Sequence, residues 1–230
     1  MQQDVQGNSW RILENYTGLV TIGTLMALAA GTINGVATNA IVFDRVSHLT
    51  GRVNNMLRDL WTNPWHGLLV VGIIYIFVLG TFLGGKLLPR LGLTRSLLVP
   101  IVPLVLVCIL LYVSQVTATP KDMYFPVRYL MAYLLALAMG LQNSVTSQTP
   151  LGRTTHFTGD LTDMGLAFAG HRWRQAGYIF SKHLGFACGG FAGFLLSRSL
   201  AEYVGIALAT GLLVAIVLFA AHLSPARIHP

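Results

Sequence analysis

The sequence predicts an all-α integral membrane protein with about six transmembrane helices, arranged as two inverted three-helix repeats with glycine-broken polar segments. Of its 230 residues, 54% are hydrophobic and only 10% are charged, and the mean hydropathy is +0.64. A soluble domain carries about 25% charged residues, so this chain cannot cover a water-facing surface. Strands are excluded because the apolar runs are too long and do not alternate as the strands of a membrane barrel do.

A short polar motif occurs twice in this apolar chain and is the basis for the repeat. The motif, His-x-Thr-Gly, begins at His48 and again at His156, 108 positions later. A polar pair and a Met follow each copy, and the upstream segments 32–35 and 140–143 match at the same offset. A shared offset over about 25 positions without a gap indicates an internal duplication.

Each half contains three apolar runs of about the length that a bilayer requires, and one polar connection. In chain order the expected spans are Tyr16–Ala40, His66–Leu88, Arg95–Val116, Pro126–Val145, Ala176–Leu196 and Ala201–His222. The polar connections are Ile41–Trp65 and Thr146–Gln175, and the linker Thr119–Asp122 separates the halves. We therefore place the first repeat at residues 1–118 and the second at 119–230, within one membrane domain.

The odd number of spans in each half determines their relative orientation. Three spans force the second half into the membrane upside down, which gives a pseudo-two-fold axis in the membrane plane. With the N-terminus in the cytoplasm, nine of the 15 Lys and Arg residues lie on or near the cytoplasmic side. This excess predicts a cytoplasmic N-terminus. The net charge of +7 favours contact with anionic lipid over nucleic acid, because the basic residues are scattered between spans.

The second and fifth spans share a spacing of small residues. Gly80 and Gly84 are four apart, as are Gly189 and Gly193. Small residues at this spacing let two helix backbones approach closely. We expect internal helix packing at these glycines, and a homodimer interface through them is the alternative.

The two polar segments form the candidate site. Glycine tolerates conformations that break a helix, and the ends of a broken helix offer free backbone groups to a polar ligand or ion near the bilayer centre. Amides inside hydrocarbon are costly unless they are bonded, and they recur near the ends of the first and fourth spans. The candidate substrate-binding residues are Asn34, His48, Thr50, Gly51, Gln142, Asn143, His156, Thr158, Gly159, Asp160 and Asp163.

The charged residues of these segments leave several interpretations open. A metal site could use His48, His156, Asp160 and Asp163. Arg52 would repel a cation there, and an Arg52–Asp160 ion pair across the pseudo-axis is a further hypothesis, as is exposure of both side chains to water. Asp160 or His156 could couple protons. Lys182, near the expected start of the fifth span, is expected to extend to the membrane interface.

Motifs of soluble enzymes and of ATP-driven transport are missing from the sequence. It has no P-loop, no dinucleotide fingerprint, no Gly-x-Ser-x-Gly and no His-Glu-x-x-His. We therefore expect neither catalysis nor a cofactor.

At its two motifs the sequence resembles the YoaK-like family of bacterial inner-membrane proteins, a domain-of-unknown-function family. The family's signatures look like Gly31–Gly35 with Ser47–Arg52, and Gly140–Asn143 with Thr158–Asp163. The chain departs from them at Asn34, where the family often has Asp, and at Arg52, where it often has Asn. The resemblance covers nearly the whole chain. It implies a fold, a bacterial inner-membrane location and a site, and little about the substrate.

Together these observations predict a small secondary transporter. A small polar or anionic solute would bind between the two repeats, and rocking of the repeats would give alternating access. The alternative is a membrane-embedded metal-binding protein or enzyme that uses the His-x-Thr-Gly segments, and a third is a non-transporting assembly or sensor subunit. Solute flux in liposomes would support the transporter. Bound metal together with turnover would support the metal-binding protein or enzyme. A stable partner protein, without flux or metal-dependent turnover, would support the assembly or sensor subunit.

Overall fold

The computed structural model describes residues 11–41, 49–116, 124–155 and 157–223, and these ranges contain helices and no strand. The helices are α1 (Tyr16–Val36), α2 (Leu49–Thr62), α3 (Pro64–Leu98), α4 (Ile101–Val116), α5 (Tyr124–Ser147), α6 (Thr158–Ala169), α7 (Trp173–Ser199) and α8 (Glu202–His222). A 3-10 turn, Arg11–Glu14, precedes α1, and a π-helical turn, Ala37–Ile41, follows it. The predicted all-α class is confirmed.

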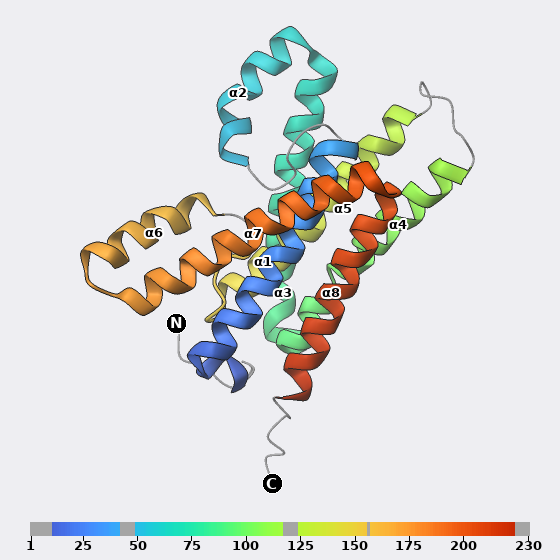
Figure 1. Ribbon diagram of the computed structural model, residues 1–230. Coiled ribbons are helices and arrows are strands. Elements are labelled where there is room, and N and C mark those ends of the chain that lie inside the picture. The colour runs from blue at the N-terminus through green and yellow to red at the C-terminus, as the bar shows by residue number, and fades with distance from the viewer. Residues whose placement is uncertain (1–10, 42–48, 117–123, 156, 224–230) are drawn as a thin grey trace.

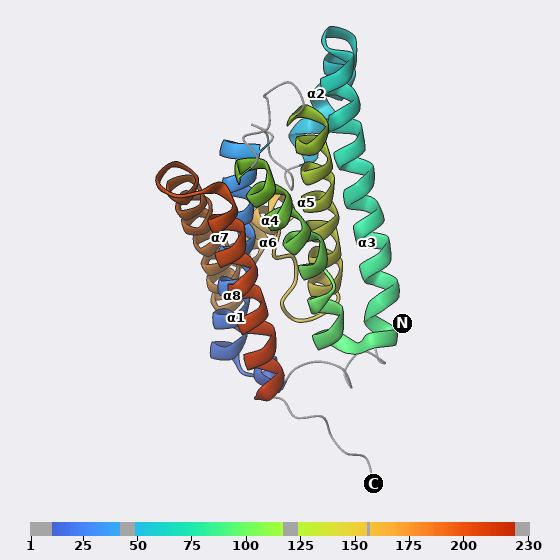
Figure 2. The ribbon, with the colours of Figure 1, turned by 90° about the vertical axis from the view of Figure 1, so that its right-hand side faces the viewer.

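Several helices have the length and composition of membrane spans. Four regions of the described chain are long and apolar enough to cross a bilayer: Tyr16–Ile41, Pro64–Val116, Trp173–Ser199 and Glu202–His222. The second of these contains two helices, α3 and α4, which run in opposite directions with α5 between them (Figure 2). These features are those of a multi-pass membrane protein.

The helix boundaries differ from the expected spans where the chain turns between α3 and α4. The second span was expected to end at Leu88, whereas the first part of α3 reaches Gly92 and a short second helical segment ends at Leu98. The two parts are separated at Gly92, whose φ of 74° and ψ of 171° are not helical, three residues after Pro89. A proline removes a backbone donor and a glycine at positive φ redirects the chain, so the two residues together permit the bend. The following helix therefore starts at Ile101 and not at the expected Arg95.

Both polar connections contain a helix, which the sequence-based boundaries did not include. The helix α2 packs on the first turns of α3 and projects above the bundle, whereas α6 packs on the first half of α7 and projects from its side (Figure 1). The turn between α2 and α3 is tight, because a Cβ on Gly67 would meet the backbone of Leu60 at 2.5 Å. Each connection thus forms a helical hairpin with the long helix that follows it.

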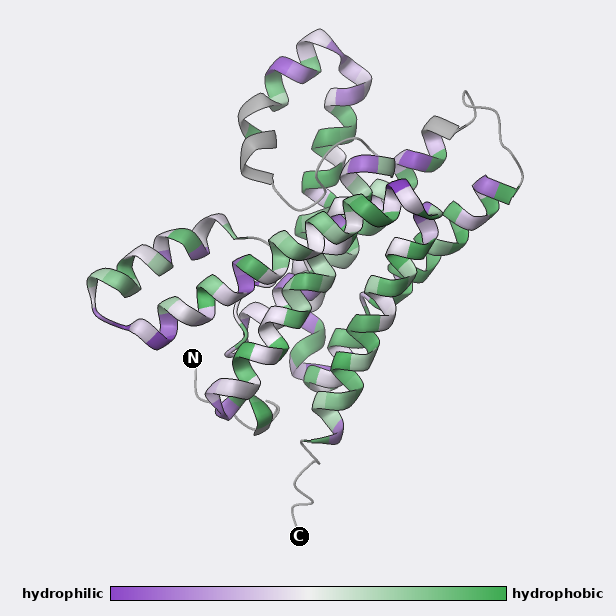
Figure 3. Cartoon of the chain, viewed as in Figure 1, coloured by the Kyte–Doolittle hydropathy of each residue, from purple (hydrophilic) through white to green (hydrophobic). Residues whose placement is uncertain are grey.

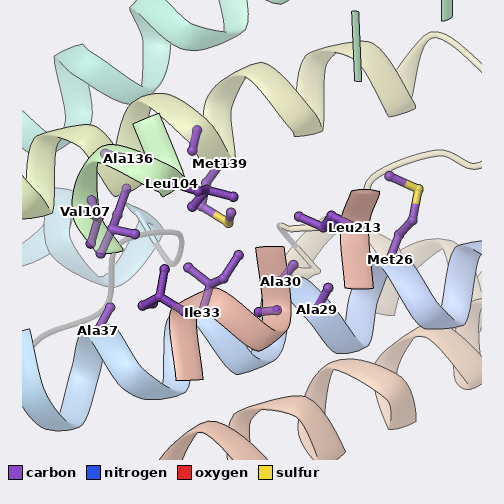
Figure 4. Close-up of a cluster of buried hydrophobic side chains, with 14 of the residues drawn as sticks. Met26, Ala29, Ala30, Ile33, Ala37, Leu104, Val107, Ala136, Met139 and Leu213 are labelled. Carbon is purple, nitrogen blue, oxygen red and sulfur yellow. The ribbon is translucent and has the colours of Figure 1, made fainter. Parts of the chain in front are cut away.

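The core lies where α1, α4, α5 and α8 meet. Figure 4 shows Met26, Ala29, Ala30 and Ile33 of α1 facing Leu104 and Val107 of α4, Ala136 and Met139 of α5, and Leu213 of α8. The many alanines allow these helices to lie close together, and the larger side chains fill the space between them. The helix α1 is consequently the most enclosed element, with 13 buried residues among its 21.

The closest helix contacts form two pairs that match residue by residue. A Cβ on Gly31 of α1 would collide with the carbonyl of Phe186 on α7, and one on Gly140 of α5 would collide with the carbonyl of Phe77 on α3. The same correspondence relates Gly189 and Leu28 to Gly80 and Leu137, and it relates Gly193 and Thr32 to Gly84 and Leu141. Counterparts in the two pairs lie 109 positions apart in every case. The α1–α7 contact is therefore repeated as the α5–α3 contact.

This offset corrects one detail of the proposed duplication. The helices on both sides of the motif correspond at 109 positions, whereas the His-x-Thr-Gly motifs correspond at 108, so the expected gapless alignment requires a one-residue gap before the motif and another after it. Asn34 then corresponds to Asn143 and not to Gln142.

The four glycines of the second and fifth spans are buried in contacts within the chain. Gly80 and Gly84 face α5, and Gly189 and Gly193 face α1. This is the expected internal packing. These contacts within the chain occupy the glycine faces of α3 and α7, and the homodimer alternative stays untested.

The outer surface of the bundle is apolar along the long helices. Hydrophobic residues cover the outward faces of α3, α4 and α8, and hydrophilic residues are concentrated in α2, near helix ends and in the connections (Figure 3). Exposed large side chains on these faces include Tyr75, Phe82, Ile109 and Phe219. A continuous apolar surface of this kind is stable against lipid and unfavourable in water.

Candidate functional site

The connection from α5 to α6 is partly buried and its described residues, 148–155 and 157, form no helix. Leu151, Thr154 and Thr155 are fully buried. Backbone groups in such a segment need internal partners. The Gln142 amide donates to the hydroxyl of Thr154 at 3.1 Å, and the hydroxyl of Thr155 donates to the carbonyl of Met139 at 3.4 Å. The end of α5 therefore holds the buried connection in place.

Lys182 supplies further partners to this segment from α7. Its side chain is only 3% exposed. The ammonium group donates to the carbonyl of Arg153 at 2.9 Å, lies 3.5 Å from that of Leu151, and donates to the carboxylate of Asp160 at 2.7 Å. The expectation that Lys182 extends to the membrane interface is wrong, because its side chain is buried and its ammonium group is bonded inside the protein.

Asp160, in the first turn of α6, accepts from Lys182 and is also close to a second cation. The guanidinium of Arg153 lies 3.7 Å from the other carboxylate oxygen, and Asp160 is 5% exposed. The same guanidinium lies against Gly159, where a Cβ would collide with it. The motif glycine thus leaves room for Arg153 beside Asp160. The proposed partner Arg52 has a side chain outside the described residues.

Aromatic rings surround the buried ammonium group. The Lys182 nitrogen lies 5.0 Å from the ring centroid of Tyr178 and 5.9 Å from that of Phe157. The Tyr178 hydroxyl donates to the carbonyl of Leu151 at 2.6 Å. His183 packs its ring on Phe157, with the centroids 4.8 Å apart. These rings shield the ion pair from water and strengthen its electrostatic attraction.

A cavity of about 360 Å³ adjoins the ion pair. It lies where α1, α6 and α7 begin, on one side of the buried connection. Its lining consists of Tyr16, Leu19, Pro150, Gly152, Asp160, Asp163, Arg174, Gln175, Tyr178, Ile179 and Lys182. The mixture of two acidic, two basic and several aromatic or apolar side chains suits a small polar solute.

The structure brings together only some of the predicted site residues. Asp160 and Asp163 line the cavity, Gly159 adjoins Arg153, and Gln142 holds the buried connection. Thr158 is exposed in the first turn of α6.

Other predicted residues lie away from this cavity. Asn34 is buried at the opposite end of α1 and does not line the cavity. Its neighbour Gly35 packs on Gly190 of α7. The side chain of Asn143 is partly buried, and its oxygen has no hydrogen-bond partner among the described residues.

Several predicted residues cannot be placed in the site. His48 and His156 lie outside the described residues. The backbone of Thr50 and Gly51 belongs to α2, and their side chains are likewise outside the described part. Among the residues that the structure describes, no three metal-ligating side chains gather.

The sequence-based site omitted the residues that α1 and α7 contribute. Tyr16, Arg174 and Tyr178 line the cavity. Tyr16 lies far from both motifs in the chain, and Arg174 and Tyr178 follow the second motif without belonging to it. Lys182 carried the one available signal, since a charged residue within an apolar helix usually faces a polar interior. The expected span began at Ala176, which placed Lys182 close to the membrane surface. A charged side chain at that position was therefore expected at the interface and not in a polar interior.

A comparison with known families identifies the chain's relatives. A family model described as a protein of unknown function (DUF1275) matches residues 22–219. The chain belongs to this DUF1275 family. The match extends from α1 to α8, so it covers both glycine-packed helix pairs and the whole of α6 and α7. No curated protein and no solved structure matches the chain.

Proposed function

We propose that this DUF1275 member is a secondary transporter of the bacterial inner membrane that moves a small polar or anionic solute by alternating access. Six helices, α1, α3, α4, α5, α7 and α8, would cross the bilayer as two inverted three-helix repeats. The N-terminus would be cytoplasmic, as the distribution of basic residues favours. The YoaK-like resemblance agrees with this location.

The matched helix contacts support the repeat architecture. The packing of α1 on α7 recurs as the packing of α5 on α3, with every partner displaced by 109 positions. In transporters built from inverted repeats, one repeat rocks against the other around a shared site. Both glycine-lined contacts join a helix of one proposed repeat to a helix of the other, so rocking would take place at these close backbone contacts.

The observation that carries the functional proposal is the buried Lys182–Asp160 pair beside a cavity. Charges inside a membrane protein are costly, and they usually mark a path for a substrate or an ion. Here the pair also stabilises a connection whose backbone is irregular, which is typical of transporter sites. A local rearrangement of the connection would therefore alter both the cavity and the ion pair.

The test is solute uptake by the purified full chain in proteoliposomes. A panel of amino acids, carboxylates, sugars and divalent metal ions would be supplied outside, with and without a pH gradient. We expect saturable uptake of one solute class, and we expect Asp160→Asn to reduce it at least tenfold. Asp59→Asn on α2 is the matched control and should retain uptake.

Size-exclusion profiles would establish that both variants remain folded. Metal binding with turnover, in the absence of any flux, would refute transport and support the alternative of a metal-binding protein or enzyme. Equal uptake by Asp160→Asn and the parent would show that transport does not depend on the ion pair beside this cavity.

A further inference from the structure

The cavity beside the ion pair carries one positive and one negative side chain that the ion pair does not use. Arg174 lies in the first turn of α7, and Asp163 lies in α6, one turn after Asp160. Within the described part of the chain, neither side chain has an ion-pair partner. The guanidinium of Arg174 rests over the ring of Tyr16, 5.1 Å from its centroid. Two opposite charges are thus presented to the same cavity.

The balance of charge in the cavity favours a ligand with no net charge. Among the charged side chains that line the cavity, Lys182 and Asp160 are paired at 2.7 Å, which leaves Arg174 and Asp163. The second cation beside Asp160, Arg153, does not belong to the lining. A simple anion would be attracted by Arg174 and repelled by Asp163, whereas a simple cation would be attracted by Asp163 and repelled by Arg174. A molecule that carries both charges would satisfy both side chains.

The two unpaired side chains give this cavity a direction. Arg174 favours a carboxylate, which a guanidinium can bind through two parallel hydrogen bonds. The helices α1, α6 and α7 all begin beside the cavity, and the partial positive charge of their N-termini also favours a carboxylate there. Asp163, one helical turn along α6, favours an ammonium group.

The remaining lining residues suit the apolar part of a small organic ligand. Leu19, Pro150 and Ile179 are apolar, and Tyr16 and Tyr178 contribute aromatic surface. The volume of about 360 Å³ lies at the small end of the range for ligand pockets, which is roughly 300–1,000 Å³.

We propose that this cavity binds a small zwitterion of the α-amino-acid type, with its carboxylate at Arg174 and its ammonium group at Asp163. The inference rests on the proposed transport function for its biological meaning, but the binding can be tested separately. It narrows the solute class from polar or anionic molecules to those that carry both charges.

The experiment is a thermal-shift and calorimetric titration of the purified full chain in detergent. The twenty amino acids are tested singly, and the best ligand is compared with two analogues, one without its amino group and one without its carboxylate. Each analogue leaves one charged side chain without its partner, so we expect it to bind roughly 10- to 100-fold more weakly.

Two variants make the test specific for orientation. Asp163→Asn should abolish the preference for the amino acid over the analogue without the amino group. Arg174→Gln should abolish the preference over the analogue without the carboxylate. Arg198→Gln, at the other end of α7, and Asp59→Asn are the matched controls and should retain both preferences. Both cavity side chains are exposed, so these variants should fold normally.

The outcomes separate the inference from the proposed function. If no amino acid stabilises the parent, or if the two variants retain the parent's preferences, the zwitterion site is refuted. Flux of another solute that depends on Asp160 would then support the proposed transport function without a zwitterion site. Amino-acid binding with no flux in proteoliposomes would preserve the site and refute transport.

Discussion

At the scale of single residues, Lys182 shows how much one charged side chain can organise in an apolar protein. It joins α7 to the carbonyl groups of a non-helical connection and to the carboxylate of Asp160. Its removal would leave a buried carboxylate with only Arg153, 3.7 Å away, as a cationic neighbour.

Lys182→Met should therefore destabilise the protein strongly. Loss of one partner of a buried ion pair costs about 3–5 kcal/mol, because the other charge stays buried and uncompensated. The measurement is the midpoint of denaturant-induced unfolding in detergent. Lys86→Met, at an exposed position of α3, is the matched control and should have little effect.

A double variant distinguishes charge from packing. Lys182→Met combined with Asp160→Leu removes both charges, and it should recover part of the stability lost in the single variant. Equal unfolding midpoints for Lys182→Met and Lys86→Met would show that Lys182 is not the buried partner that the structure describes.

At the scale of helices, the bend in α3 depends on the conformation of a single glycine. Gly92 has a φ of 74° and a ψ of 171°, a combination that is essentially restricted to glycine. For a residue with a side chain, this backbone conformation costs about 1–3 kcal/mol.

Gly92→Ala should accordingly lower the free energy of unfolding by about 1–3 kcal/mol. The control is Gly85→Ala in the straight part of the same helix, where a Cβ would make only ordinary contacts with Ser144 and Gln148. Thermal unfolding of the two variants in one detergent gives the comparison. A Gly92→Ala protein as stable as Gly85→Ala would argue against the bend.

The two matched helix pairs should respond alike to an added methyl group. In Gly80→Ala the Cβ would lie 2.5 Å from the carbonyl of Leu137, and in Gly189→Ala it would collide with the carbonyl of Leu28. Because backbone cannot move aside cheaply, each change should cost about 1–3 kcal/mol.

Gly211→Ala on α8 is the control for this prediction. A Cβ there would meet no atom within 4 Å, so the variant should be as stable as the parent or up to about 1 kcal/mol more stable, through higher helix propensity. Unfolding midpoints of all three variants decide the matter. A large loss in only one of the two tight positions would contradict the equivalence of the helix pairs.

At the scale of the whole molecule, the inverted repeat makes a prediction about membrane topology. In the proposed arrangement of six spans with a cytoplasmic N-terminus, the end of α2 would face the outside and the start of α7 would face the cytoplasm. Thr62→Cys and Arg172→Cys therefore probe opposite sides, in a background where Cys108 and Cys188 are replaced by Ser.

An impermeant maleimide should label Thr62→Cys in right-side-out vesicles and Arg172→Cys in inside-out vesicles. An odd number of spans between the two positions produces this pattern. Labelling of both positions from one side would rule out the inverted arrangement, and the reverse pattern would preserve the repeat but overturn the cytoplasmic N-terminus.

The sequence by itself determined the helical class and the helices that are long and apolar enough to cross a membrane, and it indicated a domain-of-unknown-function family. These properties depend on composition and on local patterns, such as the apolar runs and the Gly140–Asn143 and Thr158–Asp163 motifs. It also indicated a duplication, but with an offset of 108 where the helix contacts require 109.

Only the tertiary structure decided which residues share the cavity. Tyr16, Arg174 and Tyr178 carry no local signal for a site, and they meet Asp160 because α1 and α7 pack in parallel with their first turns beside α6. The depth of Lys182 follows from where α7 begins, which hydropathy defines poorly. Asn34, which the sequence placed in the site, lies at the far end of α1. The contacts between helices depend on their direction and depth, and neither is encoded in the pattern of a single segment.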